Sequence, residues 1–331
     1  MEDLVRNTHF WRDRRVLVTG ATGIVGSWLI RSLLASDARV VALIRDADPQ
    51  SELFRSGLIR EVSVVNGALE DFCTVERALN EYEVDTVFHL GAQTIVGTAR
   101  RFPLATFEAN IRGTYNLLEA VRLHADIVQR IVIASSDKAY GEQAHLPYLE
   151  KMPLAGRHPY DVSKTCADLL AQSYYHTFNL PIALTRCGNI YGGGDLNWSR
   201  IVPGTIRSLL QGESPIIRSD GKFVRDYIYV KDVTCALMRL AERLENPRVR
   251  GQAFNLSTES PVNVLQIVRV IQEIMDCEEI ELRILNRAEG EIRNQHLSAE
   301  KARNILGWNP GFKMTEALTE TVSWYRDFLG R

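Results

Sequence analysis

Five short apolar segments alternate with helix-like stretches along the first half of the 331-residue chain. Helical patterns cover 27–34, 74–80 and 105–123, and a loop follows the second apolar segment. Strands that are apolar along their whole length are buried on both faces, which requires helices on both sides of a parallel sheet. The order therefore predicts an α/β fold with a Rossmann-type, doubly wound parallel sheet. The segments are RVLVTG, RVVALIR, VSVVNG, TVFHLGA and RIVIASS.

The alternation continues after residue 160 and then becomes irregular. A helix is predicted over 162–178 and one strand over IALTRCGNIYG, followed by loops at GGGDLNWSR and RSDGKFVRDY and by helices at 264–275 and 314–329. No low-complexity linker separates the two parts. We therefore predict a Rossmann domain over residues 1–190 and a smaller C-terminal substrate lobe over 191–331, interleaved with the first.

Composition and charge argue against several classes of protein. The net charge is −2, and lysine and arginine are scattered, so no basic field attracts nucleic acid or an anionic membrane surface. No apolar run approaches the roughly 20 residues that cross a bilayer, and the N-terminal MEDLVRNTHFWRDRR lacks the apolar core of a signal peptide. We expect a cytoplasmic protein without nucleic-acid or membrane partners.

The cysteines form neither a CxxC motif nor a Cys/His pair. Their wide spacing and odd number predict neither a disulfide framework nor a metal site. We expect buried free thiols at Cys73, Cys166, Cys187, Cys235 and Cys277.

The first strand runs directly into TGATGIVGSWL, in which Gly20, Gly23 and Gly26 have the spacing GxxGxxG. Glycines at a strand-to-helix turn permit a tight bend and close approach of a ligand to the backbone. A pyrophosphate there would accept hydrogen bonds from the free N–H groups at the positive end of the helix dipole. A glycine triplet alone is a weak signal, but its place after a first strand and before an amphipathic helix predicts dinucleotide binding.

The residues after the second strand indicate which dinucleotide binds. An acid there would bind a ribose 2′-hydroxyl, whereas an arginine can accept a 2′-phosphate. The segment VVALIRD supplies Arg45 followed by Asp46. Within NAD(P), Arg45 favours NADP, while a solvated Arg45 with Asp46 on the ribose would favour NAD.

The motif YDVSK places Tyr160 and Lys164 four residues apart at the start of a predicted helix. Phenol and ammonium then share one helix face. A nearby ammonium stabilises the phenolate and lowers the pKa of the tyrosine, which would let Tyr160 act as a general base. Ser136 lies upstream at the end of the strand RIVIASS. Tyr160 and Lys164 four residues apart could occur by chance. Together with Ser136 and the glycine triplet, the pair is a more specific indication of an active site.

At this point the chain resembles the extended short-chain dehydrogenase/reductase family of nucleotide-sugar epimerases and dehydratases. The resemblance implies a tightly held NAD(P) cofactor, a C-terminal lobe that binds a nucleoside diphosphate sugar, and a homodimer. It spans nearly the whole chain, through TGATGIVG, HLGAQ, NIRGT, SSDKAYG, YDVSK, RCGNIYGGGD, RDYIYVKD and LSAEKARNILGWNP.

The resemblance also implies residue roles. Ser136 would hydrogen-bond the sugar 4-hydroxyl, Tyr160 would take its proton, and Lys164 would hold the nicotinamide ribose. The family often has an acid where this chain has Ala68, so Asp71 or the backbone would contact the adenine instead. Implied cofactor residues are Gly20, Thr22, Gly23, Ile24, Val25, Gly26, Arg45, Asp71, Leu90, Gly91, Ala92, Asn110, Tyr160 and Lys164. Implied substrate residues are Gln93, Ser136, Asn189, Arg200 and Arg225, the last as a bidentate clamp on the diphosphate.

Asp137 and Lys138 directly follow the serine, where epimerases of the family commonly have small residues. The 4,6-dehydratases have an acid and a base there, because elimination of water removes the C5 proton and protonates the departing 6-hydroxyl. The Asp-Lys pair resembles that of CDP-glucose 4,6-dehydratases and of one UDP-N-acetylglucosamine dehydratase branch. Burial beside Lys164 would depress the pKa of Lys138. A structural ion pair is the alternative interpretation.

We therefore predict an NDP-hexose 4,6-dehydratase, a lyase that oxidises C4, eliminates water and returns hydride to C6. GNIYGGGDLNWSRIVP, FWRDRRV and EGEIRNQHLSAEKA resemble the CDP-glucose dehydratases, whereas RDYIYVKD resembles epimerases and dTDP-sugar dehydratases. The alternatives are an NDP-sugar 4-epimerase and an NADPH-dependent 4-ketosugar reductase. A non-catalytic dinucleotide sensor is disfavoured, because it would not need Ser136, Tyr160 and Lys164.

Two long helical patterns, 105–123 and 162–178, carry more apolar residues than one core face requires. This excess suits a two-fold, four-helix interface in a homodimer. Simple packing of each helix on the sheet is the alternative. The residues concerned are Leu117, Leu118, Val121, Leu169, Leu170 and Tyr174.

Overall fold

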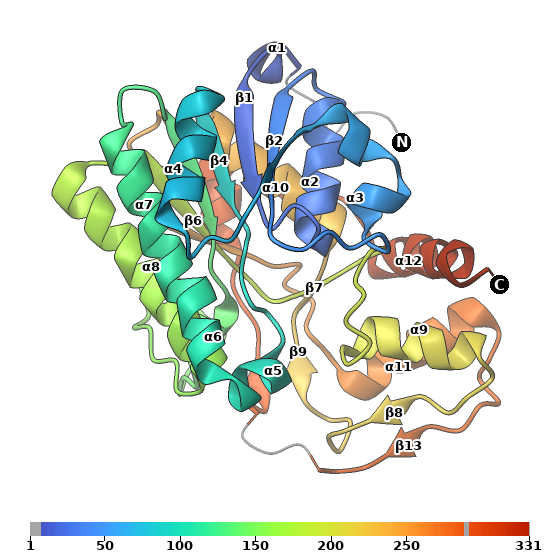
Figure 1. Cartoon of the computed structure of the whole chain (residues 1–331). Helices are drawn as coiled ribbons and strands as arrows, with labels where there is room; N and C mark the ends of the chain where they lie inside the picture. The colour runs from blue at the N-terminus through green and yellow to red at the C-terminus, as the bar shows by residue number, and fades with distance from the viewer. Residues whose placement is uncertain (1–7, 288–290, 331) are drawn as a thin grey trace.

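A seven-stranded parallel sheet forms the centre of the protein, for which a computed structural model describes residues 8–287 and 291–330 (Figure 1). The strand order is β11-β6-β5-β4-β1-β2-β3, and each neighbouring pair is parallel. The order reverses beside β1, which confirms the predicted doubly wound α/β fold. The strands are β1 (Arg15–Thr19), β2 (Arg39–Ile44), β3 (Ser63–Asn66), β4 (Thr86–His89), β5 (Arg130–Ala134), β6 (Ile182–Cys187) and β11 (Ala253–Leu256).

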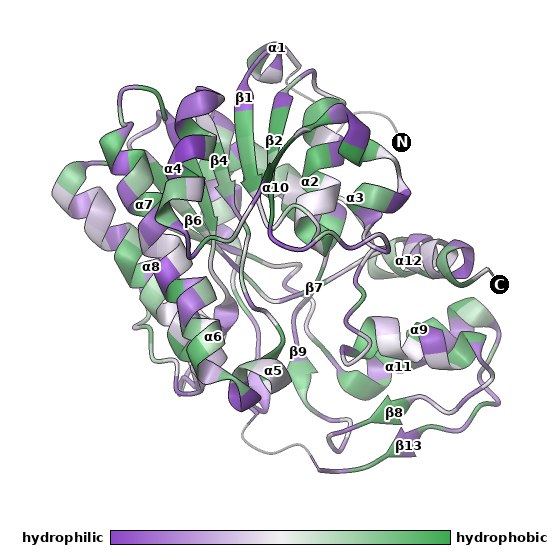
Figure 2. Cartoon of the chain, in the orientation of Figure 1, coloured by the Kyte–Doolittle hydropathy of each residue, from purple (hydrophilic) through white to green (hydrophobic). Residues whose placement is uncertain are grey.

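Helices cover both faces of this sheet, and alternate residues of β1 show why. Val16 and Val18 share a buried core with α2 and α10, whereas Leu17 shares one with α4, α7 and α8. Figure 2 shows the hydrophobic strands between helices whose polar residues lie toward the outside. The helices are α2 (Ile24–Leu34), α4 (Phe72–Glu81), α7 (Gly113–Leu123), α8 (Pro159–Phe178) and α10 (Val230–Glu242).

The single strand predicted over IALTRCGNIYG is wrong, because the chain leaves the main sheet at Gly188. The segment splits into β6 and a second strand, β7 (Asn189–Tyr191), which pairs with β10 (Tyr227–Tyr229) instead. A Cβ at Gly188 would lie 2.7 Å from the carbonyl oxygen of Asp226. The glycine therefore permits the close approach at which the chain turns toward the lobe.

The helix predicted over 105–123 is also interrupted. It consists of α6 (Pro103–Phe107), a π-helical turn η2 (Glu108–Arg112) and then α7. The π turn carries the buried Asn110, which faces the loop after β4. Such turns insert one residue into a helix and are frequent at functional sites.

Three helices pack together in a lobe beside the sheet (Figure 1). They are α9 (Ile201–Leu210), α11 (Val264–Met275) and α12 (Met314–Leu329), and their shared core includes Ile206, Ile271 and Leu318.

Between α10 and α11 the chain returns to the main sheet as β11. The small strands are β8 (Ile216–Ile217), β9 (Val224–Arg225), β12 (Val262–Asn263), β13 (Arg283–Ile284) and β14 (Asn294–Gln295). The remaining elements are α1 (Thr8–Trp11), α3 (Glu52–Arg55), η1 (Leu58–Glu61), α5 (Val96–Arg101), η3 (Asp137–Tyr140) and η4 (Ala302–Leu306).

The cysteines are free, as predicted, but most are not buried. Cys187 is buried, Cys73 is exposed, and the other three have intermediate exposure. Among residues 8–287 and 291–330 there is no group of three or more His, Cys, Asp or Glu side chains that could hold a metal ion. Within the same ranges no helix has the length and apolar character needed to cross a bilayer.

Candidate active site

A cavity of about 1220 Å³ lies between the carboxyl ends of the central strands and the lobe. Ligands of open α/β sheets bind at this edge, near the point where the strand order reverses. The predicted site residues line this cavity, apart from Asp71 and Asn110. The fold therefore brings together the glycine turn, the end of β5, the start of α8 and residues of the lobe.

The glycine turn is built for close backbone packing. Gly20 has a φ of +68°, and a Cβ there would lie 2.8 Å from the backbone nitrogen of Gly91. A Cβ at Gly26 would lie 2.2 Å from the carbonyl oxygen of Gly20. Gly23 is the N-cap of α2 and provides no side-chain cap. The first turn of this helix therefore faces the cavity at its positive end, where an anionic group is stabilised.

A buried hydrogen-bond chain fixes the loop after β4 beside the glycine turn. The backbone N–H groups of Leu90 and Gly91 donate to Thr19 Oγ1, at 3.1 and 3.0 Å. The ring of His89 bridges Thr19 Oγ1 and Thr114 Oγ1, at 2.9 and 3.0 Å. Burial, with a smaller effect of Lys164, lowers the pKa of His89 to about 3. The neutral imidazole therefore acts as a connector inside the protein.

Asn110 reaches the site through its neighbours rather than directly. Its Oδ1 accepts from the backbone N–H of Gln93 at 2.6 Å, and its Nδ2 donates to Gln93 O at 3.1 Å and to Ser163 Oγ at 2.8 Å. Gln93 lines the cavity, whereas Asn110 does not. Asn110 thus joins the loop after β4 to α8, and its contact with the cofactor stays a prediction.

Asp71 is likewise placed outside the cavity lining. It is the N-cap of α4, and its carboxylate accepts hydrogen bonds from Cys73 N at 3.1 Å and Thr74 Oγ1 at 2.5 Å. These interactions direct the side chain to the helix end. Leu69 and Glu70 line the cavity instead. Sequence reasoning named neither, because it considered only Asp71 or the backbone as a replacement for the acid that is missing at Ala68.

Arg45 and Asp46 line the cavity beyond β2, and they are paired with each other. Arg45 Nε donates to Asp46 Oδ2 at 2.7 Å, and both side chains are exposed. The two residues that favoured different dinucleotides therefore form one exposed ion pair.

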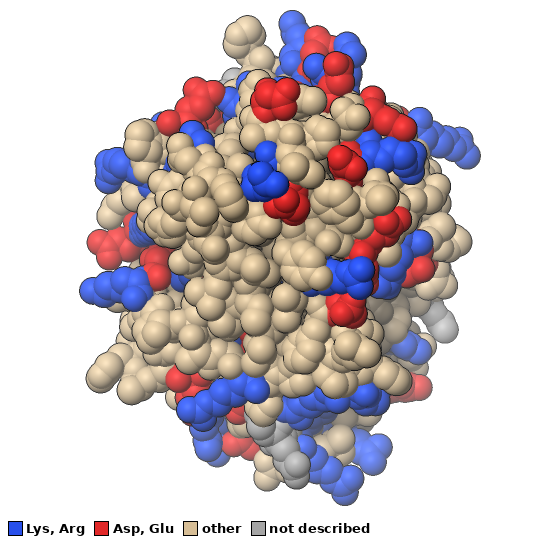
Figure 3. Space-filling model, turned by 60° about the vertical axis from the view of Figure 1, so that its left-hand side comes forward, with Lys and Arg blue, Asp and Glu red and all other residues tan. Residues whose placement is uncertain are grey.

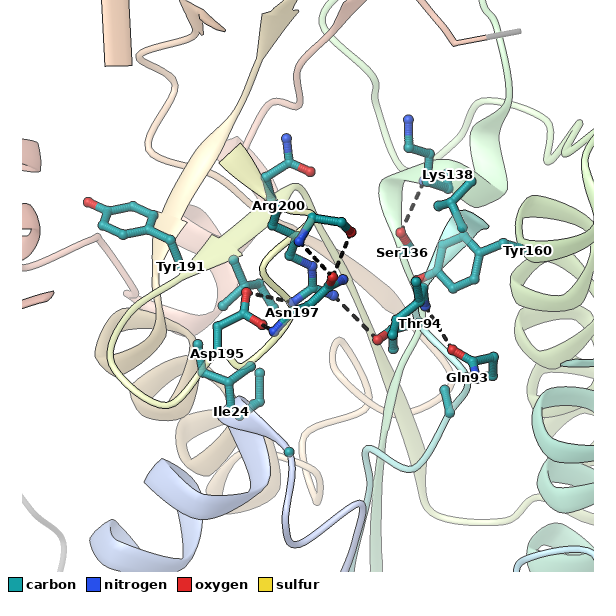
Figure 4. Close-up of a pocket in the computed structure, with 18 of the residues that line it drawn as sticks. Ile24, Gln93, Thr94, Ser136, Lys138, Tyr160, Tyr191, Asp195, Asn197 and Arg200 are labelled. Carbon is teal, nitrogen blue, oxygen red and sulfur yellow. Dashed lines mark hydrogen bonds and ion pairs between the residues drawn. The ribbon is translucent and has the colours of Figure 1, made fainter. Parts of the chain in front are cut away.

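Ser136, Tyr160 and Lys164 meet at the carboxyl end of β5, all three with less than a tenth of their surface exposed. Ser136 is the N-cap of η3, and its Oγ accepts from Lys138 N at 3.2 Å. Tyr160 and Lys164 lie in the first two turns of α8. Lys164 Nζ donates to the carbonyl oxygen of Ala134 at 2.8 Å. Figure 4 shows Ser136, Lys138 and Tyr160 on one side of the cavity, opposite Asp195, Asn197 and Arg200.

The expected lowering of the pKa of Tyr160 is not found. Burial raises the pKa of Tyr160 to about 12, with opposing effects from Ser136 and Arg200. Burial also lowers the pKa of Lys164 to about 8. The ammonium of Lys164 points to Ala134 O, so desolvation outweighs the predicted attraction between the two groups.

Asp137 is buried and Lys138 is half-buried beside the serine. Burial raises the pKa of Asp137 to about 6, against opposing effects of Lys138 and Ser136. Burial also lowers the pKa of Lys138. Lys138 Nζ donates to Gln295 Oε1 at 2.7 Å. The acid thus tends toward its protonated form and the lysine toward its neutral form, which are the forms of a proton donor and a base.

Arginines of the lobe line the opposite side of the cavity. Arg200 pairs with Asp195 at 2.9 Å and donates to Thr94 Oγ1 at 3.3 Å, which connects the lobe to the loop after β4. Arg225 is 7% exposed, with Nη1 on two backbone carbonyls and Nη2 3.4 Å from Glu291. Sequence reasoning missed Asp195 and Glu291, although both stand in quoted segments, GGGDLNWSR and EGEIRNQHLSAEKA.

Fold and site together define a Rossmann-type enzyme of the extended short-chain dehydrogenase/reductase class. A model of the family described as GDP-mannose 4,6 dehydratase matches residues 17–321, so the chain belongs to this family of nucleotide-sugar dehydratases and epimerases. The CDP-glucose 4,6-dehydratase of Salmonella typhimurium is 30% identical, over 97% of this chain and 93% of its own.

Two solved structures have closely similar folds. A UDP-glucose 4-epimerase from Thermotoga maritima has a TM-score of 0.87 at 26% identity, over 95% of this chain and 99% of its own. A dTDP-glucose 4,6-dehydratase from Streptomyces venezuelae, with NAD bound, has a TM-score of 0.86 at 25% identity, over 96% of this chain and 98% of its own. The predicted resemblance is confirmed, and the relatives of this chain include both dehydratases and epimerases.

Proposed function

We propose that the protein is an NDP-hexose 4,6-dehydratase. The observation that carries this proposal is the pair of Asp137 and Lys138. Both line the cavity beside Ser136, and their pKa values are displaced toward the acid and base forms. The relatives named as dehydratases support the same activity. An epimerase has no proton to remove from C5 and would not need this pair.

The cavity fits a nicotinamide dinucleotide. Gly20, Gly23 and Gly26 leave the backbone bare at the start of α2, and Ser135 Oγ is buried along the cavity without a hydrogen-bond partner. The chemistry supplied by a bound nicotinamide is reversible hydride transfer. The glycine turn would hold the pyrophosphate, Leu69 and Glu70 would lie along the adenosine half, and Lys164 would hold the nicotinamide ribose.

We further propose that NADP is preferred, with Arg45 on the 2′-phosphate. Arg45 pairs with Asp46, so a 2′-phosphate would have to compete for that guanidinium. Titration with NAD⁺ and NADP⁺ tests this assignment. Arg45→Ala should weaken NADP⁺ binding and leave NAD⁺ binding little changed; equal losses for both would contradict the preference.

In the first chemical step the 4-hydroxyl is deprotonated as C4 is oxidised. Ser136 would donate a hydrogen bond to that oxygen, and Tyr160 would act as phenolate and accept its proton. With its pKa at about 12, the phenol needs added positive charge to ionise. Lys164 would provide it when its ammonium turns from Ala134 O toward the site, and Arg200 already lowers the pKa of Tyr160.

In the second step water is eliminated across C5 and C6. The 4-keto group acidifies the C5 proton, which Lys138 would remove, while Asp137 would protonate the departing 6-hydroxyl. The C5–H and C6–O bonds break, a C5–C6 double bond forms, and one water leaves. Return of hydride to C6 and of a proton to C5 then gives the 4-keto-6-deoxy sugar.

The lobe would hold the nucleoside diphosphate. Arg225 faces the cavity with a guanidinium that can bind phosphate oxygens in a bidentate manner, and Glu291 would yield to the stronger anion. Asn189 and Arg200 line the same space nearer the reacting end. Arg225→Lys should therefore raise KM for the sugar nucleotide more than it lowers kcat.

A panel of CDP-, UDP-, GDP- and dTDP-hexoses tests the function. Dehydration lowers the product mass by about 18 Da, whereas epimerisation leaves it unchanged. The double variant Asp137→Asn, Lys138→Ala should still develop absorbance at about 340 nm with its substrate, yet release no dehydrated product. A wild type that gives only isobaric products would show that the dehydratase proposal is wrong.

The alternative is an NDP-sugar 4-epimerase, which the similarity to the Thermotoga maritima enzyme favours. In that case the double variant should keep turning over, because elimination is irrelevant. A 4-ketosugar reductase would use free NADPH, so a cofactor that purifies with the protein would argue against it.

We also propose that the protein is a homodimer that associates through α6, α7 and α8. Half of the residues first expected in this interface are unsuitable, because Leu117, Leu118 and Val121 are buried against the sheet. The helices expose Leu169 of the expected set together with other apolar side chains, and Figure 3 shows a broad region without charged residues at the centre of the face turned forward. The exposed residues are Phe102, Leu104, Tyr115, Leu123, Leu169 and Phe178.

A further inference from the structure

Lys138 is held by a residue from the far end of the chain. Its Nζ donates a hydrogen bond of 2.7 Å to Gln295 Oε1. Gln295 is fully buried at 0% exposure, and its Nε2 has no hydrogen-bond partner. A buried amide that leaves one group unpaired costs stability, so the contact with Lys138 calls for a role beyond packing.

The backbone around Gln295 is fixed on two sides. Strand β14 pairs with β9, which places Gln295 opposite Arg225. The next residues bracket the loop after η3, because Tyr148 N donates to His296 O at 2.9 Å and Ser298 N donates to Tyr148 O at 3.0 Å. A side chain on such a fixed backbone has a defined position. A group that orients a reacting residue needs to be held in this way.

The charges around Lys138 explain why a neutral neighbour matters. Burial and Arg225 lower the pKa of Lys138, while the carboxylates of Asp137, Asp161 and Glu291 raise it. A further carboxylate in hydrogen-bond contact would stabilise the ammonium and remove the lone pair that a base requires. An amide oxygen accepts the same hydrogen bond without adding a charge.

We propose that Gln295 is a positioning residue for the elimination step, which orients the amine of Lys138 through one hydrogen bond and leaves its lone pair available for the C5 proton. This inference depends on the proposed dehydratase function. Gln295 does not line the cavity and acts only through Lys138. It should therefore affect elimination and spare both C4 oxidation and substrate affinity.

The test compares Gln295→Glu and Gln295→Met with the wild type in single turnovers over a range of pH. The rise at about 340 nm reports C4 oxidation, and mass spectrometry of the product reports dehydration. In Gln295→Glu the alkaline rise of dehydration should move up by about one pH unit or more, because an opposite charge favours protonated Lys138. In Gln295→Met dehydration should fall about tenfold, the worth of one hydrogen bond, with the oxidation phase and KM unchanged.

Asn294→Asp is the matched control, because it adds the same charge at the exposed neighbouring position of β14 and should leave the profile unchanged. Superimposable profiles of Gln295→Glu and wild type, or wild-type dehydration by Gln295→Met, would overturn the proposal while the dehydratase function stands. A wild type that releases only isobaric product overturns both. If Gln295→Glu lacks a thermal unfolding transition, Gln295→Met decides the question.

Discussion

Replacement of Asp137 by asparagine should stabilise the folded protein at neutral and alkaline pH, although it removes the proposed catalytic acid. The side chain is 5% exposed, and its Oδ1 accepts a hydrogen bond of 3.2 Å from Ser136 Oγ. Burial raises its pKa from 3.8 to about 6, despite the opposing charge of Lys138. The ionised form is therefore less stable in the folded protein than in the unfolded chain.

The displaced pKa of Asp137 sets the size of the effect. The difference between 3.8 and about 6 corresponds to about 3 kcal/mol. Because the folded state binds this proton more tightly, the wild type loses stability as the pH rises through this window and stays at the lower level above it. Asparagine has no such proton. The variant should be more stable by up to about 3 kcal/mol at pH 8 and by about half as much at pH 5. This gain is reduced by the favourable interaction between Lys138 and the ionised Asp137, which the substitution removes.

Urea unfolding of wild type and Asp137→Asn at pH 5, 6.5 and 8 measures this difference. Asp126→Asn, the same chemical change at an exposed position, should show no comparable dependence on pH. A variant that is no more stable than wild type at pH 8, or whose advantage grows as the pH falls, would refute the reasoning. The same variant should lose dehydration, so that its gain in stability is accompanied by a loss of function.

Three further outcomes are expected. Tyr160→Phe should keep the fold and cofactor binding but lower turnover by about 10²- to 10⁴-fold, and near wild-type turnover would contradict its role as base. Gly26→Ala should weaken dinucleotide binding in a fluorescence titration, because its Cβ would lie 2.2 Å from Gly20 O; unaltered affinity would show that the turn can shift freely. Light scattering at micromolar concentration should give a dimeric mass for wild type and a monomeric one for Leu169→Glu, whereas a monomeric wild type would refute the dimer.

The central sheet could be predicted because short stretches of the sequence are enough to identify its strands. Strands such as β1 and β5 are apolar along their length and lie between helical patterns, so burial on both faces follows from the sequence. The exit of the chain at Gly188 could not be predicted, because the residues on both sides of it have strand character. Strand β11 has only four residues, and its place beside β6 depends on the tertiary fold.

The same distinction applies to the site. Ser136, Tyr160 and the glycine turn belong to short motifs whose spacing has a physical meaning. Asp71 caps α4 rather than lining the cavity, and sequence alone could not show this, because its position depends on which way the chain turns before α4. Gln295 could not be found, since no local pattern connects it with Lys138, and the contact exists only because β14 lies beside β9.

The return of the chain to the main sheet as β11 has a consequence for how such proteins can be cut or recombined. If the chain were ended at residue 190, β6 would keep β5 but lose β11, the second of its two partners, and would present an unpaired edge of six buried residues, IALTRC. Exposed edges of this kind pair with other chains and aggregate. A lobe could therefore not be exchanged with that of a relative by a single crossover after β7; a viable chimera would need at least a second junction that preserves the matched strands β6 and β11.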